Sequence, residues 1–346
     1  MVGALSNRVR RKKWKNERSL RHPIRCKERE EATPLEENQR ETTKLSLRLS
    51  IVKSALRVQD DAQPNNPTGE FWSVVDGARM RYLQCGSGPA LVLVHGLLGY
   101  SFSWRFAMPA LSPLASVYAI DMLGSGFSDR PVGLDCSLRA SAGRLLRFLD
   151  TVGITSCDLL GSSYGGAVVM MAAALAPDRV RRLILAAPVN PWSARGNWLA
   201  PILTNRIVAP LIVQLGPRRE VAHSIVLRRL FGDSRRIRPG TLEGYSAPFR
   251  IPGTLEYAIR LVRSWKQDME ELESALPQIR GVPTLLVWGR LDAAVRPVSA
   301  DKVCQQFADC RLVVFDGVGH LPYEEVPQEF NQAVIEFMSR TRTGIF

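Results

Sequence analysis

The sequence predicts an α/β fold in which a mainly parallel sheet carries helices on both faces and one helical segment is inserted. Short, almost unbroken apolar runs recur along the chain from residue 71, as expected for strands that are buried on both faces. Windows with helical periodicity fall between these runs, and this alternation favours parallel strands joined by right-handed crossovers. The composition agrees with a globular domain, because 45% of the 346 residues are hydrophobic and 23% are charged.

The expected elements follow one another in a regular order. The runs 71–75 and 79–85 flank Asp76-Gly77, a dipeptide typical of a tight β-hairpin. Six further strands are expected at 90–94, 117–120, 157–160, 183–186, 284–288 and 312–315. Helices are expected at 138–152, 164–176, 300–307 and 328–340.

The alternation stops between Pro188 and Pro283. This stretch has helical periodicity and no clear strand, and it is too long for a loop without structure, so we expect a helical subdomain over 189–282. The flanking parts, 70–188 and 283–346, then form a single core. In the insert, Trp192, Trp198 and the apolar run 207–213 predict an apolar underside.

Residues 1–69 have a different composition, rich in charge and poor in aromatic side chains, and read as an extension and linker outside the fold. Residues 1–60 hold 16 Lys and Arg against 8 Asp and Glu, a large share of the net charge of +13. Within them, residues 45–58 fit either a strand or an amphipathic helix. We expect this extension to be solvated. The alternative is that residues 1–60 contact an anionic membrane surface. Nucleic-acid binding is disfavoured, because no known nucleic-acid-binding motif accompanies the basic residues.

Several protein classes lack support in the sequence. The sequence contains no run of 18 or more apolar residues, which a membrane-spanning helix would need. The basic run 10–15 is not followed by the apolar segment of a signal peptide, so we expect a cytoplasmic location. The cysteines show neither a C-x-x-C pair nor a histidine at zinc-ligand spacing, which predicts reduced thiols, no metal and no cofactor. They are Cys26, Cys85, Cys136, Cys157, Cys304 and Cys310.

A candidate nucleophile, Ser163, follows the strand expected at 157–160. The segment 161–165, Gly-Ser-Ser-Tyr-Gly, fits G-x-S-x-G with Ser163 at its centre, and no frame centred on Ser162 fits. In this motif a sharp turn between strand and helix exposes the serine hydroxyl, and the flanking glycines relieve crowding around it. The position between a buried strand and a helix of small residues strengthens the assignment.

A serine hydroxyl needs a base within hydrogen-bond reach, usually a histidine. Of the four histidines, His22 lies in the extension, His223 lies in the insert, and His95 ends an early strand. His320 follows the last strand, at the sheet edge where ligands bind in open α/β folds. We therefore predict His320 as the base and His95 as a structural loop residue.

A carboxylate must orient the imidazole of the base and stabilise its charged form. Asp292 fits this role, because it lies four residues after the strand that ends at Trp288. The competing position after 183–186 offers Asn190, and no carboxylate occurs between residues 179 and 219. Asp292 is the predicted acid.

The oxyanion that develops during acyl transfer needs hydrogen-bond donors, which backbone N–H groups supply. The Tyr164 N–H is one candidate, because it lies directly after the nucleophile at the start of a helix. The Leu97 N–H is the second, in the loop that follows the strand at 90–94. Only the backbone matters at both positions.

These motifs together resemble the α/β-hydrolase superfamily over residues 70–343, in its Ser-Asp-His form with a helical cap. Ser163, Asp292 and His320 follow the family's order of nucleophile, acid and base. The segment 121–129, Asp-Met-Leu-Gly-Ser-Gly-Phe-Ser-Asp, looks like the family's loop after the fourth strand. The resemblance implies an eight-stranded, mostly parallel sheet with helices on both faces, and a cap or lid formed by residues 189–282.

The resemblance also implies a serine hydrolase, and the broadest expectation is cleavage of a carboxylic ester in a small, partly hydrophobic substrate through an acyl-enzyme. Dehalogenases and epoxide hydrolases of this fold carry Asp as nucleophile, which Ser163 argues against. Carbon–carbon hydrolases of the fold typically carry Trp after the catalytic His, where this chain has Leu321. That chemistry and a haloperoxidase-like activity remain alternatives, as does a non-catalytic binding protein of the same fold.

Overall fold

A computed structural model describes residues 68–193 and 218–340, all of which belong to one compact unit, Val52–Phe346. These residues form the α/β fold that the sequence predicts. Of the predicted extension, 1–69, residues 1–67 lie outside the described residues, as do Trp198 and the run 207–213. Gly69 is already part of the sheet, as the first residue of its first strand.

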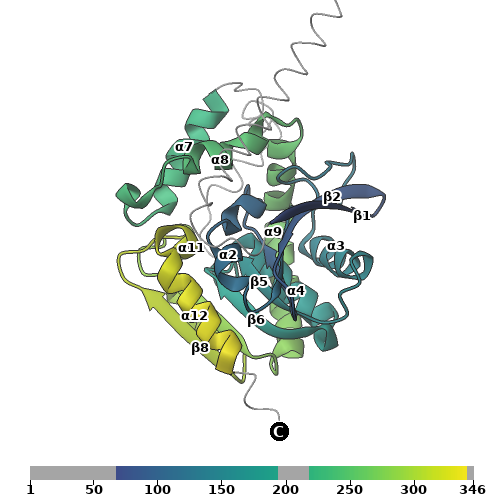
Figure 1. The fold of residues 1–346 in the computed structure, drawn as a ribbon, viewed down its shortest axis with the longest axis vertical. Helices are drawn as coiled ribbons and strands as arrows, with labels where there is room; N and C mark the ends of the chain where they lie inside the picture. Colours follow the sequence, from purple (N-terminus) through teal and green to yellow (C-terminus); the bar gives the residue numbers. More distant parts are fainter. Residues whose placement is uncertain (1–67, 194–217, 341–346) are drawn as a thin grey trace, which may run out of the picture. The chain divides into compact units, whose positions relative to one another are not determined.

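One sheet holds eight strands in the order β1-β2-β4-β3-β5-β6-β7-β8 (Figure 1). β2 pairs antiparallel with both β1 and β4, and every pairing from β4 across to β8 is parallel. The strands are β1 (Gly69–Val75), β2 (Ala78–Cys85), β3 (Ala90–Val94), β4 (Ser116–Ile120), β5 (Cys157–Ser162), β6 (Val180–Ala186), β7 (Thr284–Gly289) and β8 (Cys310–Phe315). Each expected strand is confirmed, and the differences are confined to strand ends.

The turn between β1 and β2 shows why its dipeptide predicts a hairpin. Asp76 and Gly77 adopt φ angles of 53° and 75°, and Val75 pairs directly with Ala78. Two successive residues with positive φ match the twist of the flanking strands, and Asp and Gly tolerate this conformation better than most residues.

Helices cover both faces of the sheet. Successive strand residues alternate between the two layers, so that Leu159 packs with α3 (Leu138–Thr151) and α4 (Tyr164–Leu175) and Leu160 packs on the opposite face. That opposite face is covered by α2 (Ala107–Leu111) and α12 (Pro327–Arg340). The predicted helices are present, although α10 (Ala300–Cys304) is shorter than expected. Three short helices were not predicted from hydrophobic periodicity: α2, η1 (Ser101–Trp104) and α11 (Pro322–Glu325).

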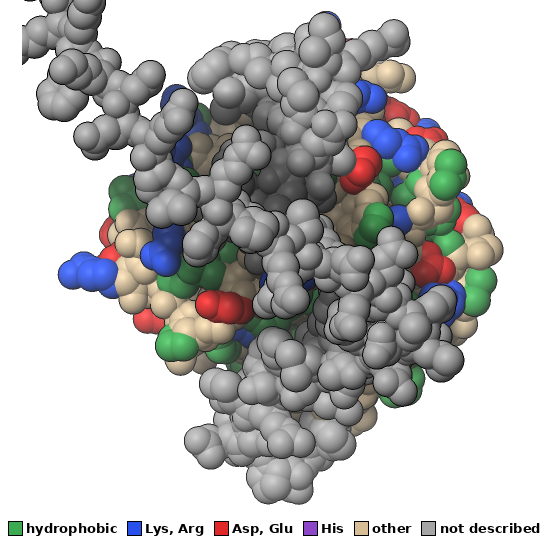
Figure 2. Space-filling view, turned by 90° about the horizontal axis from the view of Figure 1, so that it is seen from above, with side chains coloured by type: hydrophobic (Ala, Val, Ile, Leu, Met, Phe, Trp, Pro, Cys, Tyr) green, Lys and Arg blue, Asp and Glu red, His purple; other side chains and the backbone are tan. Residues whose placement is uncertain are grey.

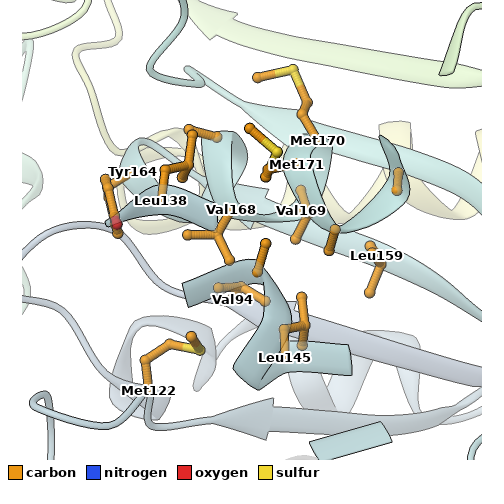
Figure 3. Packing of buried hydrophobic residues seen from close by; sticks show 14 of the residues in the cluster. Val94, Met122, Leu138, Leu145, Leu159, Tyr164, Val168, Val169, Met170 and Met171 are labelled. Carbon is orange, nitrogen blue, oxygen red and sulfur yellow. The ribbon is translucent and has the colours of Figure 1, made fainter. Parts of the chain in front are cut away.

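Helix α4, which follows the candidate nucleophile, is buried along nearly its whole length. Val168 and Val169 pack in one cluster with Val94 of β3, Leu145 of α3 and Leu159 of β5 (Figure 3). A helix that is apolar on all sides is a core helix. Its N-terminus is thereby held at the carboxyl edge of the sheet.

The predicted insert is helical in its described part. It contains α7 (Arg218–Leu230), α8 (Thr241–Ser246) and α9 (Thr254–Ala275), and α9 packs against α3 and α4. Between residues 218 and 282 the structure describes no strand. None of the helices in the described ranges is both long and apolar enough to cross a lipid bilayer.

The expectation of reduced thiols is wrong for one pair of cysteines. Cys304, the last residue of α10, forms a disulfide with Cys310, the first residue of β8, across a Cα–Cα distance of 5.5 Å. The short connection between helix and strand brings the two thiols together, a proximity that sequence spacing alone did not reveal. Cys85, Cys136 and Cys157 are free and buried, and Cys26 lies outside the described residues.

Candidate active site

Ser163 lies on a sharp turn between β5 and α4. Its backbone adopts φ 52° and ψ −119°, a left-handed conformation that is strained for a residue with a side chain. The Ser163 N–H donates to the Ala186 carbonyl at 3.0 Å, and the Ser163 carbonyl accepts from Gly166 and Val189 at 3.0 and 2.9 Å. These bonds to the end of β6 and the loop after it hold the strained turn in place.

The glycines of the turn are required by space as well as by conformation. A Cβ atom on Gly161 would lie 2.4 Å from the Gly165 carbonyl oxygen. On Gly165 it would lie 2.3 Å from the Val94 carbonyl oxygen, and on Gly166 it would lie 2.6 Å from Pro188 Cβ. The G-x-S-x-G-G segment therefore packs directly against β3 and the loop after β6, which no larger residues would allow.

His320 and Asp292, predicted as base and acid, lie in direct contact. His320 Nδ1 is 2.7 Å from Asp292 Oδ2, and each residue is only 4% exposed. The second carboxylate oxygen of Asp292 accepts from the backbone N–H groups of Ala294 and Val295 at 2.8 and 2.9 Å. With Asp292 held in this way, the Nδ1–H of His320 donates to the carboxylate and Nε2 remains available to accept a proton.

The loops that carry Ser163 and His320 are joined by the residues beside them. Ser162 Oγ donates to the hydroxyl of Tyr323 at 3.2 Å, so the residue before the serine contacts a residue three positions after the histidine. Among the described residues no hydrogen bond links Ser163 Oγ to His320 itself. Such bonds are often long in free enzymes and tighten when substrate binds.

The two predicted oxyanion donors border the serine. A Cβ atom on Gly96 would lie 3.0 Å from Ser163 Cβ and 3.7 Å from Ser163 Oγ, which places the loop of Leu97 against the nucleophile. Tyr164 is the first residue of α4, where backbone N–H groups have no partner within the helix. Within the described ranges, neither the Leu97 nor the Tyr164 N–H donates a hydrogen bond.

His95 has a different environment from His320, as expected for a structural residue. Its Nδ1 donates to the Gly96 carbonyl at 2.8 Å, and its Nε2 accepts from the Met122 N–H at 3.1 Å. Burial lowers the pKa of the His95 imidazole. Of the other histidines, His22 and the His223 side chain lie outside the described residues.

Asn190, the alternative to Asp292, is a fully buried structural residue. Its side-chain amide donates to the Pro188 carbonyl at 2.9 Å and to Ser299 Oγ at 3.1 Å. Its Oδ1 accepts from the N–H groups of Trp192 and Ser193. Asn190 thereby shapes the loop after β6 that supports the Ser163 turn.

The segment 121–129 supports the site through the buried carboxylate of Asp121. Asp121 is fully buried, and its carboxylate accepts from the N–H groups of Ser101 and Phe127 at 2.7 and 2.9 Å. Arg81 of β2 pairs with the same carboxylate at 3.2 Å. This network fixes the loops after β3 and β4 beside the oxyanion donors.

A buried ion pair that the sequence did not predict links the core to the insert. Arg105 Nη2 donates to Glu324 Oε2 at 2.7 Å and to Thr241 Oγ1 of α8 at 3.0 Å. Tyr245 of α8 donates to Glu324 Oε1 at 2.7 Å, and burial raises the pKa of Glu324 despite its cationic partner. Arg105 and Glu324 are 219 positions apart, so spacing could not have revealed them.

The arginines of the insert are partly engaged in such contacts. Arg235 pairs with Asp233 at 2.8 Å, whereas Arg236 and Arg238 donate to the carbonyls of Gly317 and Glu324 at 3.1 and 2.8 Å. On the described surface visible in Figure 2, basic and acidic side chains are interspersed with apolar ones. The described part of that face therefore presents no continuous patch of one charge.

Comparison with known proteins identifies the family to which this fold belongs. A family model described as alpha/beta hydrolase fold matches residues 89–218. The chain is 29% identical over 283 residues to haloalkane dehalogenase 2 of Mycobacterium tuberculosis, which covers 78% of this chain and 95% of that protein. It is 30% identical over 272 residues to the dihydrolipoyllysine-residue acetyltransferase component of the acetoin cleaving system of Pseudomonas putida. This match covers 77% of this chain and 68% of that protein.

Solved structures show the same fold. A meta-cleavage product hydrolase from Pseudomonas fluorescens superposes with a TM-score of 0.67 at 22% identity, covering 79% of this chain and 98% of that one. The sheet, the turn at Ser163 and these similarities define an α/β-hydrolase architecture. This chain belongs to the α/β-hydrolase superfamily, and its relatives support a hydrolytic enzyme.

Proposed function

We propose that this protein is a serine hydrolase that cleaves a carboxylic ester in a small, partly hydrophobic substrate through a covalent acyl-enzyme. The observation that carries the proposal is the 2.7 Å contact between His320 Nδ1 and Asp292 Oδ2, on loops joined to the strained turn of Ser163. A histidine oriented by a buried carboxylate near a half-buried serine is the arrangement that activates a hydroxyl for acyl transfer.

The reaction begins when Ser163 Oγ attacks the ester carbonyl carbon and its proton moves to His320 Nε2. The carbonyl oxygen becomes an oxyanion, which accepts hydrogen bonds from the Leu97 and Tyr164 N–H groups. The tetrahedral intermediate collapses when Nε2–H protonates the leaving alcohol, and the acyl group stays on Ser163. His320 then removes a proton from water as the water oxygen attacks the acyl carbon, and it returns a proton to Ser163 Oγ as the bond to the acyl group breaks and the acid leaves.

Asp292 contributes by holding the imidazole rather than by accepting its proton. Its Oδ1 is already bound by two backbone N–H groups, so Oδ2 faces the Nδ1–H of His320 in one orientation. A negative charge at this distance stabilises the imidazolium that forms in both halves of the reaction.

The serine distinguishes this proposal from the activity named for the dehalogenase relative. Ser163 attack on an alkyl halide would form an ether, which water activated by a histidine does not cleave. Serine attack on an ester instead forms an acyl-enzyme that water can hydrolyse. An acyl group with an apolar part is supported by two partly buried hydrophobic residues, Leu97 in the loop that borders Ser163 and Trp192 in the loop after β6.

The test is labelling of the full chain with a fluorophosphonate probe, in wild type and in Ser163→Ala. We expect wild-type labelling that is lost in Ser163→Ala, together with a decrease in kcat of about three orders of magnitude or more on nitrophenyl esters. A series of nitrophenyl esters with acyl chains of increasing length then shows which acyl length gives the highest kcat/KM. A vinylogous 1,5-diketone, assayed in parallel, tests the alternative of carbon–carbon bond hydrolysis. A folded wild type that neither labels nor turns over esters would contradict the proposal and favour a binding protein.

A further inference from the structure

Two adjacent glutamates, Glu324 and Glu325, lie buried on α11, directly after the loop of His320, and the proposed reaction uses neither. Glu324 has a cationic partner, since Arg105 donates to it at 2.7 Å. The side chain of Glu325 is fully buried, yet the cation beside it, Arg236, is 3.8 Å away. A buried carboxylate in such a position must be stabilised by other donors.

Those donors are backbone N–H groups from two segments that are distant in sequence. Glu325 Oε1 accepts from Gly319 at 2.7 Å and from Gly232 at 3.0 Å. Oε2 accepts from Gly232 at 3.0 Å and from Asp233 at 3.2 Å. Gly319 directly precedes His320, whereas Gly232 and Asp233 follow α7 in the insert, so one carboxylate joins the histidine loop to the insert.

The two segments are also bonded to each other. The His320 N–H donates to the Leu230 carbonyl at 2.6 Å, at the end of α7. A Cβ atom on Gly319 would lie 2.3 Å from the Leu230 carbonyl oxygen, and one on Gly232 would lie 2.7 Å from the Gly319 nitrogen. The two backbones are therefore in direct contact, with no room for side chains between them. Segment 230–233 packs against one side of the histidine loop.

The opposite side of the histidine loop packs against the turn that carries Asp292. The Leu291 N–H donates to the Val318 carbonyl at 2.8 Å, and a Cβ atom on Gly289 would lie 2.0 Å from the Gly319 carbonyl oxygen. The histidine loop is thus packed between the Asp292 turn of the core and segment 230–233 of the insert. Loss of either side would free the imidazole to move.

We propose that Glu325 is a positioning residue for His320, which holds the imidazole in its reactive position only while segment 230–233 is docked on the histidine loop. The inference rests on the serine hydrolase function proposed above. Two acceptor oxygens satisfy three N–H groups that would otherwise be buried without partners. Because the carboxylate binds protein backbone and not substrate, its loss affects the reaction rate more than substrate binding.

The test is Glu325→Gln in the full chain, assayed with p-nitrophenyl acetate. The substitution keeps the volume but turns one acceptor oxygen into an NH₂ group that faces N–H donors. We expect kcat and the rate of fluorophosphonate labelling to fall by about 10- to 100-fold, with KM nearly unchanged. The NMR signal of the proton between His320 and Asp292 should shift or broaden in the variant.

Glu324→Gln is the matched control, because it makes the same change in the adjacent residue, which is equally buried and also contacts the insert. We expect it to lower Tm at least as much, since it breaks an ion pair, while kcat and the His320 proton signal stay near wild type. Equal kcat losses in the two variants, or an unchanged kcat in Glu325→Gln, would overturn the positioning role.

Arg236→Gln tests the same contact from the insert and covers the case in which Glu325→Gln does not fold. It removes the hydrogen bond to the Gly317 carbonyl and the cation beside Glu325, and we expect a smaller kcat loss with KM preserved. An unchanged kcat in this variant would count against the proposal. Labelling that persists in Ser163→Ala would overturn both proposals, whereas Ser163-dependent labelling at the wild-type rate in Glu325→Gln overturns the positioning role alone.

Discussion

The loop after β3 and the loop after β8 each carry a buried histidine at the carboxyl edge of the sheet, and the two histidines have opposite environments. His95 and His320 are both 4% exposed. Both ring nitrogens of His95 are bonded to backbone groups, at Gly96 and Met122. His320 has a carboxylate at Nδ1, and its Nε2 has no hydrogen-bond partner in the described ranges.

The difference shows that the partners of a histidine, rather than its burial or its place on the sheet, determine what it can do. Backbone partners that fill both nitrogens of His95 leave no site for a proton from substrate, and burial lowers its pKa. The carboxylate of Asp292 instead provides a counter-charge for an imidazolium, and the open Nε2 provides a place for the proton. The same substitution at both positions should therefore give opposite results.

The largest effect is expected for His320→Gln, which removes the proposed base. The serine would lose its proton acceptor, so kcat should fall by about four orders of magnitude or more on a nitrophenyl ester. The urea unfolding midpoint should stay close to that of the wild type, so the loss of kcat would not be due to unfolding. A variant that retains a substantial part of the wild-type kcat would remove the distinction between the two histidines.

A smaller effect of another kind is expected for His95→Gln. A flexible amide cannot satisfy both the Gly96 carbonyl and the Met122 N–H in the geometry of the ring, so the free energy of unfolding should fall by about 1–3 kcal/mol. The measurement is urea denaturation followed by circular dichroism, with kcat determined on the folded fraction. A loss of kcat as large as that of His320→Gln would give His95 a catalytic role and contradict the comparison.

The smallest effect concerns pH. The pKa of His95 is lowered from 6.5 in the folded state, so the unfolded chain binds a proton first as the pH falls. The free energy of unfolding should therefore decrease from about pH 7 down to the lowered folded pKa, because stability rises with pH wherever the unfolded state binds more protons. His95→Gln should lose this part of the slope in urea titrations between pH 5 and 7.5. An identical slope in the two proteins would show that His95 is accessible to protons when folded.

The regular part of the fold was predictable because its signals are local. An apolar run such as 90–94 has the length of a strand covered on both faces and is too short for a typical buried helix. Asp76-Gly77 likewise specified its hairpin through backbone conformation alone. By contrast, α2 (Ala107–Leu111) is too short to show a helical period and exists because its residues pack on the core.

The polar contacts between distant segments were not predictable. Arg105 and Glu324 meet only when the chain has folded, and no pattern within either segment anticipates the pair. The disulfide between Cys304 and Cys310 was missed because it depends on where α10 ends and β8 begins. Glu325 follows the histidine loop in the sequence, but its carboxylate accepts from the N–H of Gly232, which lies 93 positions away in the insert.

The sequence by itself determined which chemistry this protein can carry: a serine in G-x-S-x-G, a carboxylate and a histidine, each placed after a strand of a parallel sheet. That much follows from residue types and from the rule that the carboxyl ends of parallel strands meet at one edge. Only the tertiary structure decided which histidine is open and which is filled, and how the loop of His320 is held between core and insert. Those properties depend on contacts of 2.7 to 3.1 Å between segments far apart in the chain, and spacing along a sequence does not specify such contacts.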